Sequence, residues 1–163
     1  MEAAAAAAQT VTVGAASDEG RHIGPVVNAT QFNKIQDLIQ KGIDEGARLV
    51  AGGIGRPEGF NKGFYVRPTV FADVNNSMTI AQEEIFGPVL SIIPFDTEEE
   101  AIALANDTVY GLTNYIQTQD QDKAKRVARS LRSGMVEMNG HTRGAGAPFG
   151  GMKQSGNGRE GGK

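Results

Sequence analysis

Apolar positions spaced three and four residues apart predict the helices of this chain. The clearest case begins at residues 28–31, Asn-Ala-Thr-Gln, which have the form of a capping box. Gly46 is expected to end this helix, because glycine readily adopts the left-handed conformation that follows a helix. The buried face would consist of four residues at helical spacing, namely Phe32, Ile35, Ile39 and Ile43.

Two further helices combine a capping signal with an apolar face. Residues 97–100, Thr-Glu-Glu-Glu, form a second capping box, and Asp120 is expected to cap a later helix that ends at Gly134. Residues 2–9 should be helical because alanine has the highest helix propensity, and residues 77–84 predict a short helix. The inward residues would be Ala101, Leu104 and Ala105 in the first of the two capped helices, and Ala124, Val127, Ala128 and Leu131 in the second.

Extended segments lie between these helices. They are predicted over residues 10–13, 47–51, 64–66, 69–71, 89–95, 112–118 and 135–138. Residues 89–95 are nearly all apolar, which is typical of a strand buried on both faces. From residue 47 onward strands and helices alternate, and this order predicts an α/β fold with a largely parallel sheet covered by helices.

The composition limits the chemistry. The 163 residues are 39% hydrophobic and 21% charged with a net charge of −3, which is typical of a globular protein and not of a nucleic-acid binder. Cysteine is absent, which excludes disulfides, cysteine metal ligands and a cysteine nucleophile in this chain, and the two histidines, His22 and His141, argue against a metal site. We expect a cytoplasmic protein without a membrane partner, because neither a long apolar run nor a secretory signal is present.

Glycine is the other unusual residue. It occupies 22 of 163 positions, and nine of these fall in residues 140–163. Glycine loses the most conformational entropy on folding, so such a segment does not readily form a helix or a strand. The segment is either a disordered tail, which composition alone favours, or a loop shaped to approach a ligand or another surface.

Three segments offer candidate chemistry. Residues 83–88, Glu-Glu-Ile-Phe-Gly-Pro, could present a carboxylate that accepts hydrogen bonds from ribose hydroxyls, or could be a solvated helix end followed by a turn. Gln31 and Lys34 lie one helical turn apart and could bind a ribose or a phosphate, or form an ordinary solvated face. Residues 148–160 are rich in glycine but lack the spacing of a phosphate-binding loop.

Together these segments resemble one family. Residues 83–89 are similar to the Glu-Glu-x-Phe-Gly-Pro motif of the NAD(P)-dependent aldehyde dehydrogenases, residues 106–112 to that family's Asn-x-x-x-Tyr-Gly-Leu, and residues 148–160 to its C-terminal signature. Several motifs in the same order make the resemblance specific. It extends from about residue 13 to residue 160 and implies the fold of part of the family's catalytic domain.

The resemblance implies cofactor-binding residues, because the family uses NAD or NADP. Glu84 matches the glutamate that binds the ribose on the nicotinamide side, and Phe86 matches the ring that packs beside the nicotinamide. Gln31 and Lys34 match two residues near the adenosine ribose. These four residues are therefore the expected cofactor site.

Substrate-binding residues follow from the same resemblance. Phe149 matches a ring that lines the aldehyde tunnel, and Glu160 matches a glutamate close to the proton and water network of the active site. Asn139 matches an asparagine near the substrate pocket. Residues 140–163 would then be a loop around the substrate entrance rather than a disordered tail.

The chain also departs from the family. It lacks the cysteine nucleophile and the general-base glutamate motif, so residues 1–163 are expected to be a partial catalytic domain, with an Ala-rich helix and loop over 1–22 and a Gly-rich loop or tail over 140–163. We expect a fragment of an oxidoreductase that oxidises an aldehyde to a carboxylic acid with NAD(P)+. Alone it should be inactive and bind the cofactor weakly or not at all.

Surfaces that normally meet the rest of such an enzyme would be exposed in this chain. They predict self-association into a homo-oligomer. The alternative to an enzyme fragment is a non-catalytic binding or oligomerisation module that reuses the same fold.

Overall fold

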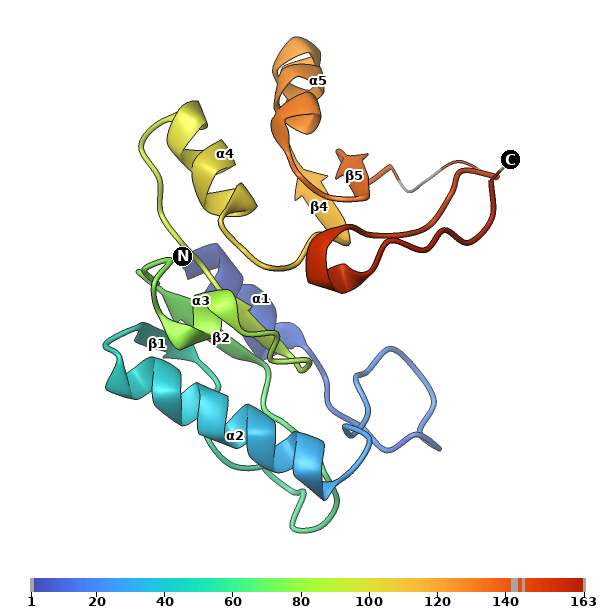
Figure 1. Cartoon of the computed structure of the whole chain (residues 1–163). Helices are drawn as coiled ribbons and strands as arrows, with labels where there is room; N and C mark the ends of the chain where they lie inside the picture. Colours follow the sequence, from blue (N-terminus) through green and yellow to red (C-terminus); the bar gives the residue numbers. More distant parts are fainter. Residues whose placement is uncertain (1, 142–143, 145, 163) are drawn as a thin grey trace. The chain divides into compact units, whose positions relative to one another are not determined.

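The computed structural model describes residues 2–141, 144 and 146–162. The chain divides into two compact units, Met1–Pro94 and Phe95–Lys163 (Figure 1). Residues 142, 143 and 145, which belong to the expected Gly-rich loop, lie outside the described residues. No helix in the described part is both long enough and apolar enough to cross a membrane.

The first unit contains a three-stranded sheet and three helices. The elements are α1 (Glu2–Thr10), α2 (Ala29–Asp44), β1 (Arg48–Ala51), β2 (Thr69–Ala72), α3 (Thr79–Gln82) and β3 (Val89–Ser91). The strand order is β1-β2-β3, with β1 and β2 antiparallel and β2 and β3 parallel. The α/β class is therefore confirmed, whereas the antiparallel β1 departs from the parallel order expected from residue 47 onward.

Helix α2 begins and ends where the sequence predicts. The Asn28 side chain accepts a hydrogen bond from the Gln31 N–H at 2.9 Å. Gly46, with φ of 91°, follows the C-terminal cap at Glu45 and has the left-handed conformation expected after a helix. The helix is thus fixed at both ends by local interactions.

The core of the first unit lies between α2 and one face of the sheet. Ile35 and Ile39 are fully buried there against Phe71 of β2, and Phe32 is also buried. Ile43 is 37% exposed, contrary to prediction, because Gly42 occupies the core position in the last turn. A Cβ atom at Gly42 would approach Ile80 and Phe71 closely, so the absence of a side chain allows this packing.

The opposite face of the sheet is turned toward α1. Successive residues of a strand point to opposite faces, so Val70 faces away from the core that contains Phe71. Val70 is buried and lines a shallow cavity together with Ala4, Ala7 and Leu90. Figure 1 shows α1 and α2 on the two sides of the sheet.

Several predicted strands are shorter than expected or absent. The expected strand 89–95 reduces to β3, and its Leu90 is 51% exposed, so burial on both faces was wrong. Leu90 lies on the same face of the sheet as Val70, where the small alanine side chains of α1 leave it partly uncovered. Residues 64–66 form no strand, and Val13 makes only an isolated bridge with Ile23.

The second unit contains a parallel two-stranded sheet with α5 as the crossover between its strands. Its elements are α4 (Glu98–Asn106), β4 (Thr113–Ile116), α5 (Gln121–Ser130), β5 (Met135–Met138) and a 3-10 turn η1 (Lys153–Ser155). The sheet of this unit is separate from the first, so the single sheet implied by the sequence is two sheets.

The helix starts of the second unit agree with the predictions. The Thr97 hydroxyl accepts a hydrogen bond from the Glu100 N–H at 3.1 Å, and the Glu100 carboxylate accepts one from the Asp96 N–H at 2.8 Å. The Asp120 carboxylate accepts hydrogen bonds from two N–H groups at the start of α5. The four residues predicted inward follow the expected face. Ala124 is fully buried, and Val127, Ala128 and Leu131, which caps the end of α5, are half-buried.

Two details of the second unit differ from prediction. Helix α5 ends at Ser130 rather than at Gly134, because the Asn106 side chain accepts a hydrogen bond from the Arg132 N–H and donates one to the Ser130 carbonyl. Ala105 is exposed, although it was expected to face inward. The asparagine of the 106–112 motif thus stabilises the end of a helix that lies later in the chain.

Candidate functional site

The four residues expected to bind a cofactor lie close together in the first unit. Gln31 and Lys34 lie one turn apart on α2, and residues 84–86 connect α3 to β3. The Gln31 amide donates hydrogen bonds to the carbonyl oxygens of Ile85, at 2.9 Å, and Phe86, at 3.1 Å. The Lys34 ammonium donates to the Glu84 carbonyl oxygen at 2.9 Å. Residues 50 to 55 positions apart in sequence therefore form one local arrangement.

This arrangement changes the interpretation of the first capping box. The Asn28 oxygen accepts from the Gln31 N–H as expected, but the Gln31 side chain is directed to residues 84–86 instead of back to the helix start. The side chain of Gln31 thus joins two elements that are distant in sequence. Spacing alone gave no sign of this second role.

The side chains of Glu84 and Phe86 are exposed around a fixed main chain. Ile85, between them, is buried in the core, and the Phe86 ring is 72% exposed. Phe86 has φ of 55°, the left-handed region that bulky residues rarely adopt. A Cβ atom on Gly87 would lie 2.6 Å from the end of the Ile35 side chain, so the absence of a side chain at Gly87 allows the close approach to α2. The segment can present one carboxylate and one aromatic ring to a ligand.

In the second unit, the C-terminal segment packs against the residue 106–112 motif. Gly111 accepts a hydrogen bond from the Met152 N–H at 2.9 Å and donates one to the Ser155 hydroxyl at 3.0 Å. The Lys153 ammonium donates to the carbonyl oxygens of Asn106 and Thr108, both at 2.9 Å. The described part of residues 148–160 therefore packs as a loop against the 106–112 motif.

Two of the three expected substrate residues face each other across this loop. Phe149 and Glu160 form an antiparallel bridge in which each N–H donates to the other's carbonyl oxygen at 2.7 Å. The Phe149 side chain is 37% exposed and Glu160 is exposed. The loop thus presents a partly exposed aromatic ring and a carboxylate from neighbouring backbone positions.

The third expected substrate residue, Asn139, has a different environment. It follows β5 with φ of 54°, and its side-chain oxygen accepts a hydrogen bond from the Thr118 N–H at 2.9 Å. Its own N–H donates to the Ile116 carbonyl oxygen at 2.7 Å. Asn139 therefore connects the ends of β4 and β5.

Two carboxylates with lowered pKa values lie at contacts between helices. Hydrogen bonds from the Thr79 hydroxyl and N–H lower the pKa of Glu45, and a nearby Lys41 acts in the same direction. Arg126 lowers the pKa of Glu98 through a paired hydrogen bond between α5 and α4. These carboxylates stabilise helix contacts.

In the described residues, no three His, Asp or Glu side chains come together as a metal site would require.

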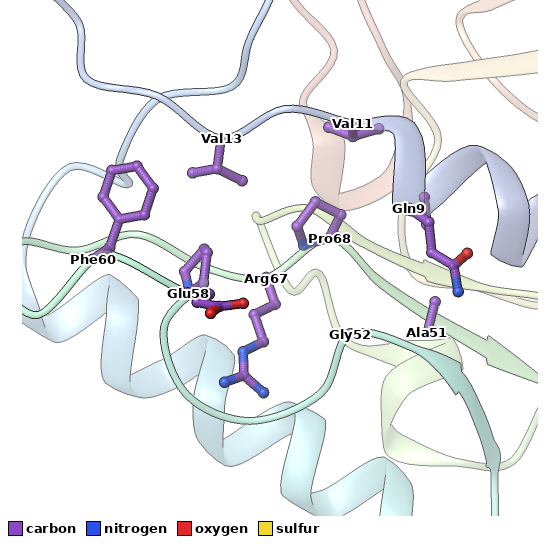
Figure 2. Close-up of a pocket in the computed structure, with 11 residues that line it drawn as sticks. Gln9, Val11, Val13, Ala51, Gly52, Glu58, Phe60, Arg67 and Pro68 are labelled. Atoms are coloured by element: carbon purple, nitrogen blue, oxygen red, sulfur yellow. The ribbon is translucent and has the colours of Figure 1, made fainter.

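A cavity of about 460 Å³ in the first unit was not expected from the sequence. Figure 2 shows it beneath Val11 and Val13, with Phe60 and Pro68 as further apolar walls. Arg67 also lines it, and the guanidinium Nε donates to the Arg56 carbonyl oxygen at 2.7 Å. None of the candidate cofactor residues lines this cavity.

Comparison with known proteins places the chain in a family. The aldehyde dehydrogenase family profile matches residues 1–163. A curated protein of Staphylococcus saprophyticus is 53% identical over 150 residues, which are 92% of this chain and 32% of that protein. The chain thus spans about a third of the length of such relatives.

Solved structures agree closely with the fold. An aldehyde dehydrogenase from Bartonella henselae has 61% sequence identity and a TM-score of 0.97, covering 99% of this chain and 34% of that one. A cysteine-to-alanine mutant of aldehyde dehydrogenase C from Pseudomonas syringae, complexed with NAD+ and octanal, has 52% identity and a TM-score of 0.94, covering 97% and 33%. An aldehyde dehydrogenase from Mycobacterium tuberculosis, complexed with NAD+, has 54% identity and a TM-score of 0.91, covering 95% and 32%.

The resemblance carried by residues 83–89, 106–112 and 148–160 is therefore confirmed at the level of both sequence and fold. The chain belongs to the aldehyde dehydrogenase family.

Proposed function

We propose that this chain supplies the nicotinamide-ribose contact and part of the substrate entrance of an NAD-dependent aldehyde dehydrogenase. The observation that supports the cofactor role is the outward carboxylate and ring of Glu84 and Phe86, on a main chain hydrogen-bonded to Gln31 and Lys34. NAD is the favoured cofactor because two of the similar structures contain NAD+. The reaction would convert an aldehyde to a carboxylic acid.

The residues present fit a dinucleotide at this place. Both side chains are exposed, and a carboxylate is a good acceptor for two neighbouring hydroxyl groups. We infer that the Glu84 carboxylate accepts hydrogen bonds from the ribose hydroxyls and that the Phe86 ring packs against the nicotinamide. When bound, the cofactor accepts a hydride; the residues of this chain orient it and contribute no electrons.

The substrate role is assigned to the loop of the second unit. Phe149 offers a partly exposed ring to an aldehyde chain, and Glu160 offers a carboxylate for proton transfer at the entrance. Asn139 would act indirectly by fixing the backbone at the end of β5, because its side-chain oxygen accepts a hydrogen bond from the Thr118 N–H. The octanal bound to the similar Pseudomonas syringae enzyme makes an aliphatic aldehyde the first substrate to examine.

By itself this 163-residue chain is expected to be inactive, since it contains no cysteine thiolate to attack an aldehyde. We also expect weak NAD+ binding, because one ribose carboxylate and one ring provide few contacts. A homo-oligomer and a cytoplasmic location remain part of the proposal. The exposed apolar side chains that support self-association include Val27, Phe86, Leu90 and Tyr115.

The cofactor proposal is tested by titrating the ¹⁵N-labelled chain with millimolar NAD+ and following amide chemical shifts. We expect shifts at residues 84–87 that weaken strongly in Glu84→Gln. The matched control is Glu58→Gln, an exposed carboxylate on the cavity of Figure 2, which should leave these shifts unchanged. Unchanged amides at residues 84–87 in the unmodified chain, or shifts confined to the cavity, would contradict the proposal.

The activity proposal is tested by NADH formation from octanal with the purified chain. No rate above that of a Glu84→Ala control is expected. A clear excess over this control would contradict inactivity. Absence of both turnover and NAD+ binding, together with stable self-association, would favour the non-catalytic module instead.

A further inference from the structure

We infer that Gln31 and Lys34 are positioning residues that fix the direction of the Glu84 carboxylate and the Phe86 ring by binding the main chain between them. The inference rests on the proposed cofactor role of Glu84 and Phe86. Its basis is that two side chains of α2 donate to three consecutive carbonyl groups, those of Glu84, Ile85 and Phe86.

The main chain at Phe86 requires such support. Its φ of 55° lies in the left-handed region, which is unfavourable for a residue with a Cβ atom. Packing of the ring does not compensate, because the ring is 72% exposed. The neighbouring residues do anchor the segment: Ile85 is buried, and Gly87 lies close to Ile35. The hydrogen bond from the Gln31 side chain joins the Phe86 main chain to α2, an element that is distant in sequence.

The two donors are well placed to act together. Residues three apart lie on the same face of a helix, so Gln31 and Lys34 project from α2 toward the same segment. The helix itself is fixed by the Asn28 cap and by the burial of Ile35 in the core. A rigid helix therefore determines the position of the three carbonyl groups, and through them the two outward side chains.

This role differs from the one that the family resemblance implied. There, Gln31 and Lys34 were expected to lie near the adenosine ribose and to act directly on the cofactor. In the structure their polar groups already bind protein carbonyl groups. Their first effect on cofactor binding is thus to raise the fraction of molecules in which residues 84–86 have the conformation that binds the cofactor. If that conformation is lost, the apparent affinity falls by the lost fraction.

The test uses Gln31→Met, Lys34→Met and the double variant of the full chain, with Gln40→Met as the control. Methionine preserves side-chain length but cannot donate a hydrogen bond. Gln40 lies on the same helix and donates instead to Asp44 at 2.7 Å. The readout is the backbone conformation of Phe86, measured by its three-bond HN–Hα coupling and its Cα and Cβ shifts in the absence of NAD+.

We expect the left-handed signature of Phe86 in the unmodified chain and in Gln40→Met. Its population should fall about tenfold in the double variant, given the ordinary cost of this conformation. Amide exchange of Ile35 and Phe71 monitors whether the core is intact; if the double variant does not fold, the two single variants, each expected to cause a smaller loss, decide the question. A Phe86 signature that is unchanged in all folded variants would overturn the inference.

NAD+ affinity separates this inference from the proposed function. We expect about tenfold weaker binding in the double variant, and recovery in Lys34→Arg relative to Lys34→Met, because the guanidinium can still donate to the Glu84 carbonyl. If the variants alter Phe86 while NAD+ shifts no amide of residues 84–87 in the unmodified chain, the positioning role stands and the cofactor role fails. Weaker NAD+ binding with an unchanged Phe86 conformation would instead show that Gln31 and Lys34 act directly on the ligand.

Discussion

The main chains of Phe149 and Glu160 are paired by two reciprocal hydrogen bonds, each 2.7 Å between nitrogen and oxygen. The bridge closes a loop whose interior residues bind the 106–112 motif through Lys153 and Ser155. Two signatures of the family that are far apart in sequence are thus one structural element. Substitutions in either should disturb the positions of Phe149 and Glu160.

Lys153→Met is expected to destabilise the second unit by about 2 kcal/mol, because two hydrogen bonds from a charged, partly buried group are lost. Urea unfolding followed by circular dichroism, combined with amide exchange of Gly111, measures the effect. Lys125→Met, at an exposed position of α5, is the control and should change stability by less than about 0.5 kcal/mol. Equal stability of the two variants would argue against a structural role for Lys153.

Gly134→Ala should be more damaging than its small volume suggests. A Cβ atom at this position would collide with the carbonyl oxygen of Gly150, which is backbone and cannot move aside as a side chain can. We expect a loss of about 3 kcal/mol in unfolding free energy and displacement of the loop that follows. Gly158→Ala, with nothing within 4 Å of the added carbon, is the matched control. If both variants unfold at the same denaturant concentration, the close approach is not present in solution.

Acid should weaken the contact between α2 and α3 through Glu45. The Thr79 hydroxyl and N–H, with Lys41, lower the pKa of this carboxyl in the folded chain below its ordinary value of 4.5. Its contribution is therefore complete above pH 4.5 and declines as the pH falls through the folded pKa, because the unfolded chain binds the proton first.

Unfolding of the first unit measured at a series of pH values below 5 tests this expectation. Glu45→Gln should flatten the acid dependence, since the ionisable group is gone. Thr79→Val removes the hydroxyl donor but keeps the N–H, so an intermediate slope is expected. An acid dependence identical in all three chains would assign the acid sensitivity to other carboxyl groups.

Self-association should depend on Tyr115, which is 75% exposed on β4. It lines an apolar cavity of about 370 Å³ with Phe95, Val127 and Leu131, and such a surface favours contact with another apolar surface. Light scattering after size-exclusion chromatography should show a mass above that of a monomer, and Tyr115→Thr should lower it. Thr108→Ala, away from this cavity, is the control. A monomer at high concentration would contradict the prediction.

Local signals predicted the helices well. Asn28, Thr97 and Asp120 each accept the capping hydrogen bonds that their position in the sequence indicates. Such interactions involve residues within one turn, so the sequence pattern contains all of their participants. The buried residues Phe32, Ile35 and Ile39 follow for the same reason, since the spacing defines the face.

Long-range relationships could not be read in this way. The exposure of Leu90 depends on what α1 places over its face of the sheet, and the end of α5 depends on Asn106, 24 positions before Ser130. Gly134 was interpreted as the end of a helix, whereas in the structure glycine is needed there because a side chain would collide with the Gly150 carbonyl oxygen. The motifs indicated which residues belong to the candidate sites, but their mutual support, such as Gln31 with Phe86, required the folded chain.

Phe86 combines a main chain bonded to a rigid helix with a ring that protein atoms scarcely surround. Rotation of an exposed side chain takes picoseconds to nanoseconds, far less than the time of a catalytic turnover. The main chain therefore sets the direction in which the ring projects, and rotation of the side chain lets the ring adjust about that direction as a flat ligand arrives and leaves. Position 86 should tolerate other aromatic residues without loss of folding, and the variants should differ in the rate at which the ligand dissociates.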